Sequence, residues 1–143
     1  MKNIDEFAYG GIVFNDEEQV MMRSPSNFWG GYVWTFAKGS YDSSDTTPEV
    51  TAVREVREET GYECRIVREI PGEFASDTCI TKYFLMKPTG IILPYDKETQ
   101  DVTWFGIEEA FNMIKLTKSE KGRNRDRDVL LSALKIKELL SDF

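Results

Sequence analysis

The sequence predicts a protein of the α/β or α+β class, built as a sandwich with a mixed β-sheet. Two observations carry this prediction. Short apolar and aromatic runs bounded by turn-forming residues recur along the chain, and segments with helical periodicity stand between them at intervals. The 143 residues, 41% hydrophobic and 30% charged, match an ordinary globular domain. We therefore expect one domain over residues 1–143.

The predicted strands are apolar or aromatic runs between polar or glycine-containing turns. The first covers Phe7–Phe14, and a polar turn leads the chain back into a second strand at Gln19–Arg23. A loop rich in Ser, Pro, Asn and Gly follows at residues 24–31. Further strands are expected at Tyr32–Phe36, Glu63–Ile70, Thr78–Met86 and Val102–Phe105.

The central helix is predicted at Pro48–Thr60. Thr47 suits the N-cap position, because its hydroxyl can accept a bond from a free backbone N–H of the first turn. Proline is favoured at the first helical position, where its missing N–H costs nothing. Gly61 stands where a left-handed residue commonly ends a helix.

The last third of the chain predicts two more helices. A short one is expected at Ile107–Met113, and an amphipathic one at Arg125–Leu140 closes the chain. Three arginines alternate with Asn124, Asp126 and Asp128 over residues 123–128, around the start of that last helix. We interpret this segment as a solvated, internally paired turn. The alternative is that it folds over the functional site and grips distal phosphates.

Composition excludes several classes of function. The formal net charge of −7 argues against a nucleic-acid-binding protein, which needs a basic face. The chain has no histidine, which removes Ser-His-Asp, Cys-His and histidine-ligated zinc mechanisms. Cys64 and Cys79 are interpreted as buried, reduced thiols. No apolar run approaches the ~18 residues of a membrane span, and residues 1–10 lack a signal-peptide pattern. We expect a cytoplasmic protein.

Three glutamates, Glu55, Glu58 and Glu59, fall within five residues of the central helix. Positions i, i+3 and i+4 share one face, and like charges there destabilise a helix by about 0.2–0.5 kcal/mol per pair. A bound cation would relieve this repulsion. Oxygen ligands suit Mg²⁺ first and Mn²⁺ second, and Mg²⁺ keeps open positions for substrate phosphates. The face therefore indicates phosphate chemistry, with a solvated charged surface as the alternative.

The same segment resembles the box of the Nudix hydrolases, G-x5-E-x7-R-E-U-x-E-E-x-G-U, where U is bulky and apolar. Its second half, Arg54 to Tyr62, matches at every specified position if Tyr62 counts as U. The first half departs from the pattern. Asp45 stands where Glu is expected after Gly39, and eight residues instead of seven precede Arg54. Thr46 takes the glutamate position in an alternative alignment. The resemblance covers roughly residues 8–112.

The resemblance implies an α/β/α sandwich and a metal-dependent hydrolase. Its substrate would be a nucleoside diphosphate linked to another group, and the bond cleaved a phosphoanhydride. By position, the metal ligands would be Glu55, Glu58 and Glu59, with the backbone carbonyl of Lys38 or Gly39 as a further ligand. Glu58 would thus be a catalytic residue as well as a metal ligand.

Two further roles follow from the resemblance. Arg54 would brace the loop before the helix, paired with Asp45 if the extra residue bulges the loop. Family members often take another carboxylate from a loop before a later strand, and Glu98 lies six residues before Trp104. We expect Glu98 to be a fourth metal ligand or the general base, with Asp96 and Asp101 as rivals.

Four residues are candidates for contacting the substrate. Trp29 and Tyr32 flank the loop that leads to the box and could stack on a nucleobase, because an aromatic face accepts any base. Core packing is the alternative, and it is favoured for Trp34. Arg23 and Lys38 could contact phosphates, against the alternative of exposed charge at a strand edge.

Within the family, the segment around residues 34–39 and the spacing from Glu98 to Trp104 look most similar to dinucleoside polyphosphate hydrolases. The alternatives are an ADP-ribose or nucleotide-sugar pyrophosphatase, a nucleoside triphosphate pyrophosphohydrolase, and a non-catalytic nucleotide-binding module. The altered loop at Asp45 favours the last, while the clustered glutamates argue against it. The expected partner is a small-molecule nucleotide. Homodimers are common in the family.

Overall fold

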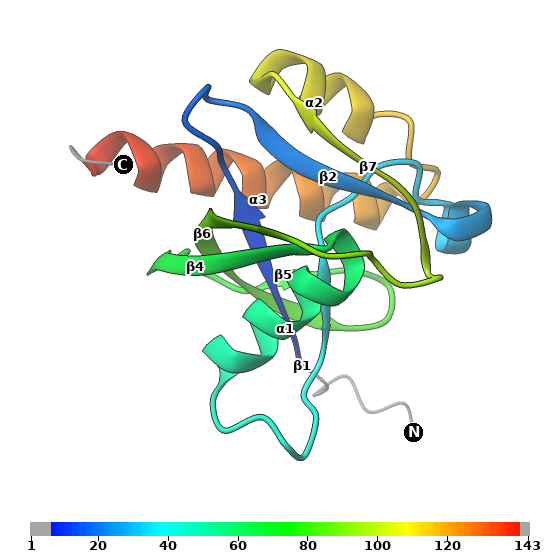
Figure 1. The fold of residues 1–143 in the computed structure, drawn as a ribbon. Coiled ribbons are helices and arrows are strands. Elements are labelled where there is room, and N and C mark those ends of the chain that lie inside the picture. Colours follow the sequence, from blue (N-terminus) through cyan, green and yellow to red (C-terminus); the bar gives the residue numbers. More distant parts are fainter. Residues whose placement is uncertain (1–6, 141–143) are drawn as a thin grey trace.

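A computed structural model describes residues 7–140 and contains two β-sheets flanked by helices (Figure 1). The larger sheet has the order β3-β1-β6-β4, and a short strand, β5, also pairs with β6. These strands are β1 (Phe7–Val13), β3 (Lys38–Ser40), β4 (Tyr62–Glu69), β5 (Phe74–Ala75) and β6 (Ile80–Ile92). β1 and β6 run parallel and the other pairs antiparallel, which confirms the predicted mixed sheet. A second, antiparallel sheet joins β2 (Val20–Pro25) to β7 (Thr99–Phe105).

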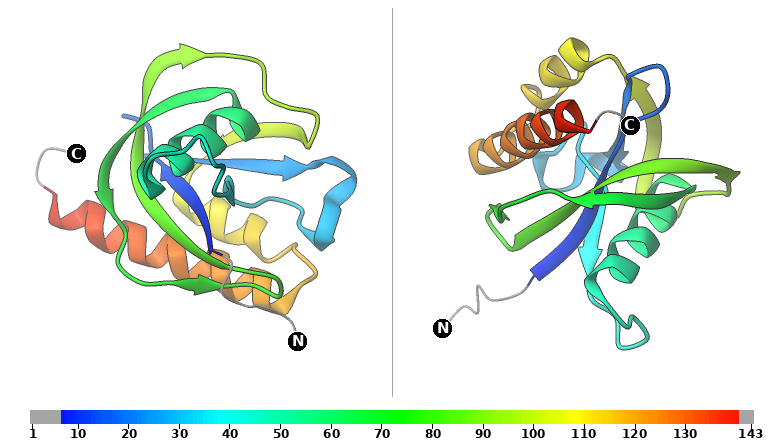
Figure 2. Two further views of the ribbon diagram at one scale, coloured as in Figure 1. Left: turned by 90° about the horizontal axis from the view of Figure 1, so that it is seen from below. Right: turned by 90° about the vertical axis from the view of Figure 1, so that its left-hand side faces the viewer.

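Helices cover both faces of the larger sheet (Figure 2). They are α1 (Pro48–Thr60) and α3 (Glu120–Leu139), while α2 (Ile107–Ile114) packs against α3 and β2 of the second sheet. α1 packs against β1, β3 and β4, whereas α3 packs against β5 and β6. Side chains alternate between the faces of a strand, so Ile12 joins the apolar cluster beneath α3 and its neighbour Val13 the cluster beneath α1. The predicted α/β/α sandwich is therefore confirmed.

The ends of α1 agree with the sequence prediction. Thr47 Oγ1 accepts a hydrogen bond from Val50 N at 3.2 Å, and Pro48 is the first helical residue. Gly61 ends the helix with φ of 81°, a left-handed conformation that glycine adopts without a side-chain clash. Across residues 7–140, no helix combines the length and the apolar character that a bilayer crossing demands.

The predicted strand at Tyr32–Phe36 is wrong. Only Thr35 pairs there, through two backbone hydrogen bonds of 2.9 Å with Arg23 in β2. Two residues later, the Ala37 carbonyl accepts from Gly11 N in β1 at 3.2 Å, and β3 begins at Lys38. The segment crosses from one sheet to the other, so its backbone cannot form a ladder with either until Lys38.

Several element boundaries also differ from the prediction. The predicted loop at residues 24–31 supplies the last two residues of β2 and a short 3₁₀ helix, η1 (Ser26–Gly31). β6 continues to Ile92 because it pairs with β4 along most of that strand. α3 begins at Glu120, where Ser119 Oγ accepts from Gly122 N at 3.0 Å. The predicted solvated turn at residues 123–128 is therefore wrong, since that segment is helical.

Candidate active site

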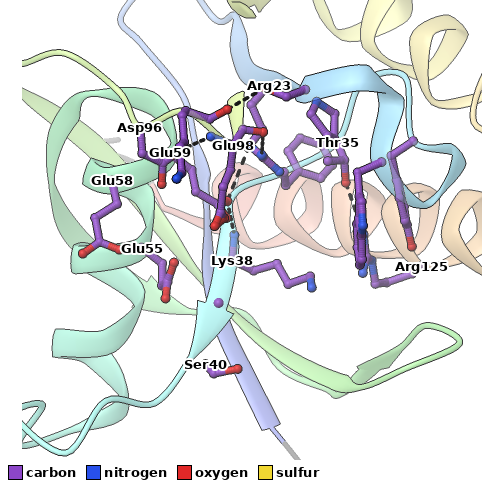
Figure 3. Close-up of a pocket in the computed structure, with 17 residues that line it drawn as sticks. Arg23, Thr35, Lys38, Ser40, Glu55, Glu58, Glu59, Asp96, Glu98 and Arg125 are labelled. Atoms are coloured by element: carbon purple, nitrogen blue, oxygen red, sulfur yellow. Dashed lines mark hydrogen bonds and ion pairs between the residues drawn. The ribbon is translucent and has the colours of Figure 1, made fainter. Parts of the chain in front are cut away.

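A cavity of about 780 Å³ opens beside α1, β3, η1 and the loop before β7 (Figure 3). Its volume falls within the range of about 300–1,000 Å³ that is usual for small-molecule sites. All the residues proposed from the sequence line it except Arg54. The proposed residues that line the pocket are Arg23, Trp29, Tyr32, Lys38, Gly39, Glu55, Glu58, Glu59 and Glu98. Segments far apart in the sequence thus meet at one place.

The three glutamates of α1 occupy different environments. Glu58 is the most accessible, with 44% of its side chain exposed, whereas the side chains of Glu55 and Glu59 are largely buried. Glu59 Oε1 accepts from Lys38 N at 3.1 Å and lies 3.6 Å from Arg23 Nε. Burial raises the pKa of Glu59 to about 7 despite the opposing charge of Arg23. Burial also raises the pKa of Glu55, against the effect of Arg54. The protein alone therefore leaves this negative charge incompletely compensated.

Arg54 connects α1 to the preceding loop. Its Nε and Nη2 donate to the two carboxylate oxygens of Asp45 at 3.1 and 2.8 Å, and Nη2 also donates to the Ser40 carbonyl at 3.0 Å. Nη1 reaches Glu55 and Glu58 at 3.2 and 3.1 Å. The hydrogen bonds from Arg54 hold the pKa of Asp45 well below its usual range. Asp45 therefore pairs with Arg54, as expected for the acidic residue of the box, although the loop between them is one residue longer than in the family pattern.

Gly39 allows the closest approach between β3 and α1. A Cβ atom at this position would collide with the carboxylate carbon and both carboxylate oxygens of Glu55, so any other residue there would displace this carboxylate. The arrangement places a glutamate carboxylate directly against the backbone of β3. Carboxylate and backbone carbonyl oxygens are the ligands that Mg²⁺ and Mn²⁺ prefer.

The donor chemistry fits a hard divalent cation, but the side chains are not yet gathered around one. Within residues 7–140, no three acidic or cysteine side chains stand close enough together to form a ready metal cluster. Nη1 of Arg54 instead bonds the carboxylates of Glu55 and Glu58. Arg54 bonds Oε2 of Glu55 and Oε1 of Glu58, so a cation could bind the other oxygen of each carboxylate or could replace Arg54 as their partner.

The loop before β7 brings further carboxylates to the pocket. Asp96 N donates to the Glu58 carbonyl at 2.8 Å, and Asp96 Oδ1 accepts from Glu98 N at 3.0 Å. The Glu98 carbonyl accepts from Arg23 Nη2 at 2.9 Å, and the Glu98 residue is exposed at the pocket edge. Asp101 lies on β7 outside the pocket lining and bonds Val102 N. Of the three candidates, Glu98 and Asp96 therefore lie beside the site.

The aromatic candidates separate into pocket and core residues. Trp29 is 75% exposed at the pocket wall. It follows Asn27 and Phe28, which have φ of 57° and 51°, values that are strained for a residue as bulky as Phe28. Trp34 instead packs edge-to-face on Phe105, with ring centroids 5.0 Å apart, as the core alternative expected.

The preferred interpretation of residues 123–128, a solvated turn, missed Arg125, which only the alternative of a contact with distal phosphates brought to the site. The Arg125 side chain is 2% exposed and lines the pocket from α3. A signal was present, because Val129, Ala133 and Ile136 form a buried stripe, and Arg125 lies one helical turn before Val129 on the same face. Arg23 also differs from the strand-edge alternative, since it is buried between Thr99, Glu59 and the Glu98 carbonyl.

Comparison with known proteins agrees with this architecture. A family model described as NUDIX domain matches residues 6–131. A NUDIX hydrolase from Nitrosomonas europaea superposes with a TM-score of 0.74 at 12% identity, over 97% of this chain and 97% of that one. An Ap4A hydrolase from C. elegans, solved as a binary complex, gives 0.71 at 18% identity, over 94% and 99% of the two chains.

A third solved structure, an ADP-ribose pyrophosphatase from Streptococcus suis 89-1591, gives a TM-score of 0.69 at 17% identity. The superposition covers 96% of this chain and 94% of that one. No curated protein matches the chain. At such identities the solved structures establish the fold, while the family match extends over most of the sequence. The chain therefore belongs to the NUDIX family of pyrophosphohydrolases.

Proposed function

We propose that this pyrophosphohydrolase depends on Mg²⁺, with Mn²⁺ as a substitute, and cleaves a nucleoside diphosphate linked to another group. One observation carries the proposal. The carboxylates of Glu55, Glu58 and Glu59 line the same nucleotide-sized pocket as Gly39 and Glu98. Oxygen ligands of this kind suit a metal that also binds substrate phosphates.

The proposed ligands are Glu55, Glu58 and Glu59, together with the backbone carbonyl of Gly39 or Lys38. When bound, the metal would neutralise phosphate oxygens as negative charge develops, which is the main requirement of phosphoryl transfer. Arg54 fixes the position of these groups, because it bonds the Ser40 carbonyl on β3 as well as the carboxylates of α1.

Glu98 is our candidate for the general base. A base must reach the attacking water and must be ionised to accept its proton. The exposed side chain of Glu98 at the pocket edge supports the first requirement. Glu58 is the alternative, since it is the most accessible of the three α1 glutamates.

The substrate is proposed to lie with its base against Trp29 and its phosphates near Lys38. The indole of Trp29 is exposed at the pocket wall, so a base can stack on it without a rearrangement of the core. Arg23 already bonds Thr99, Glu59 and the Glu98 carbonyl, which makes it a support for the loop as well as a source of positive charge.

We propose a dinucleoside polyphosphate as the substrate class, with ADP-ribose, nucleotide sugars and nucleoside triphosphates as alternatives. A cytoplasmic location and a homodimeric state stay predictions from the sequence.

The test is product release from a panel of diadenosine polyphosphates, ADP-ribose, sugar nucleotides and nucleoside triphosphates. Each is assayed with Mg²⁺, with Mn²⁺ or with chelator. We expect metal-dependent turnover of one class, with diadenosine polyphosphates preferred, and no turnover in chelator. Nucleotide binding without turnover of any substrate would contradict the proposal and favour a binding module.

A further inference from the structure

The end of the pocket far from Glu55 and Glu58 contains a buried guanidinium group (Figure 3). Arg125 Nε donates to Asp126 Oδ1 at 3.0 Å, and Nη2 donates to Thr35 Oγ1 at 3.2 Å. Thr35 Oγ1 in turn donates to Asp126 Oδ2 at 2.7 Å. Within residues 7–140, no hydrogen-bond partner is found for Nη1 of Arg125. One edge of the guanidinium is thus fixed, while Nη1 keeps its hydrogen-bonding capacity at a pocket wall.

Tyr32 fixes the same guanidinium from its face. The Arg125 Cζ atom lies 5.0 Å from the centre of the Tyr32 ring. The ring is itself held against α3, because a Cβ atom at Gly122 would approach the Tyr32 hydroxyl oxygen to 2.7 Å. An arginine held in this way loses little further freedom when it binds an anion, and such preorganisation favours binding.

A second arginine on α3 provides the contrast. Arg127 pairs with Asp128 at 3.1 Å, with the same sequence spacing as Arg125 and Asp126, but both of those side chains are 53% exposed. Burying an Arg–Asp pair carries a desolvation cost that an apolar pair would avoid. Stability alone therefore does not explain the buried pair, whereas an anion bound at Nη1 gives the burial a function.

Lys38 adds positive charge at the same end. Its backbone N bonds Glu59, while its side chain extends toward Arg125 in Figure 3. Its Nζ lies 3.8 Å from Cys79 Sγ. Burial raises the pKa of the Cys79 thiol, but Lys38, two hydrogen bonds and Arg125 together hold it below its ordinary value. The Cys79 thiol therefore lies within electrostatic range of both Lys38 and Arg125. The Lys38 side chain extends from the end of the pocket that contains the α1 carboxylates toward Arg125.

We propose that Arg125 determines substrate specificity by donating, through Nη1, to a phosphate that lies beyond the bond being cleaved. The proposal rests on the proposed hydrolase function. Arg125 would favour nucleotides whose phosphate chain continues beyond the scissile bond. Nucleotides that carry a neutral group in place of that further phosphate would be poorer substrates.

The test compares diadenosine tetraphosphate with diadenosine diphosphate, which lacks a spare phosphate. The readout is the ratio of their kcat/KM values, because a partial folding defect scales both values equally. Loss of a hydrogen bond to a charged group should lower this ratio by about ten- to a hundredfold in Arg125→Gln. Arg127→Gln is the matched control and should leave the ratio unchanged. An unchanged ratio in folded Arg125→Gln would overturn the proposal.

A second measurement separates this proposal from the hydrolase function. If the wild-type protein cleaves neither substrate, metal-free calorimetry with inorganic tripolyphosphate tests the subsite alone. Weaker binding by Arg125→Gln but not by Arg127→Gln would support it, and equal binding by all three proteins would overturn it. If Arg125→Gln does not fold, NMR of the wild-type guanidinium groups replaces the variant. Tripolyphosphate must then shift the Arg125 signals and leave those of Arg127 in place, and the absence of a shift would overturn the proposal.

Discussion

Arg54 supports the end of the pocket that contains Glu55 and Glu58, the acidic end, without lining it, whereas Arg125 lines the opposite, basic end. The two arginines hold their charges in different ways. Arg54 shares its guanidinium among Asp45, Glu55 and Glu58 across the end of a loop. Arg125 has one carboxylate partner, Asp126, and is almost completely buried. The acidic end therefore contains alternative partners that a cation can rearrange, whereas the basic end is rigid before any ligand binds. A metal site benefits from the first arrangement and a specificity site from the second.

The largest expected effect tests the acidic end. Replacing Glu58 with Gln should lower kcat by about 10²–10⁴-fold, because it removes a carboxylate proposed to act in catalysis. The protein should stay folded, since this side chain is among the more exposed in the pocket. Glu49→Gln is the control on the same helix, away from the pocket. Steady-state kinetics on the preferred substrate gives the answer, and equal rates for both variants would remove Glu58 from the site.

The next largest effect concerns the aromatic wall between the two ends. Trp29→Ala should raise KM by about 5- to 150-fold, the range expected when stacking worth about 1–3 kcal/mol per base is lost. The melting temperature should change little, because the side chain is mostly exposed. Phe28→Ala is the neighbouring control, as Phe28 is exposed but absent from the pocket lining. A similar KM change in both variants would indicate a loop effect and not stacking.

A smaller effect tests whether the backbone approach at Gly39 supports metal binding. Gly39→Ala should push the Glu55 carboxylate away from β3 and weaken Mg²⁺ binding by about 10–100-fold, as changes to groups that position metal ligands commonly do. The measurement is the rise in melting temperature with Mg²⁺, which depends on binding to the native state. Gly106→Ala is the control, since a Cβ there meets no atom within 4 Å. An equal rise in melting temperature with Mg²⁺ in both variants would contradict a role for Gly39 in metal binding.

The smallest effect concerns the ion pair that supports the acidic end. The pKa of Asp45 is lowered in the folded protein, so its contribution to stability is complete above the unfolded-state pKa of about 3.9 and is lost as the pH falls below it. Asp45→Asn should therefore lower the melting temperature at pH 5–7, and the difference from wild type should shrink below pH 4. Asp128→Asn, at an exposed pair, should show little change at any pH.

The sequence predicted the acidic end better than the basic end. The helix caps, the carboxylate face and the Arg54–Asp45 pair depend on short-range spacing, which is visible along the chain. Arg125 reaches the pocket only because Thr35 and Tyr32, about ninety residues earlier, pack against α3. Charge alternation at residues 123–128 suggested solvent, and only the buried stripe of α3 placed Arg125 on the inner face. The position of Arg125 in the pocket therefore depends on long-range packing, which the local sequence pattern does not reveal.

The segment that crosses between the sheets has a consequence for how the two ends communicate. Thr35 bonds Asp126 at the basic end, and Lys38 N bonds Glu59 at the acidic end, three residues away. Between them the chain is also tied to both sheets through Arg23 and Gly11. A metal that orders the acidic end, held against the already fixed basic end, would thus leave less flexibility for a polyphosphate chain that contacts both ends to remove. By thermodynamic linkage, a metal and a polyphosphate chain would then each strengthen the binding of the other.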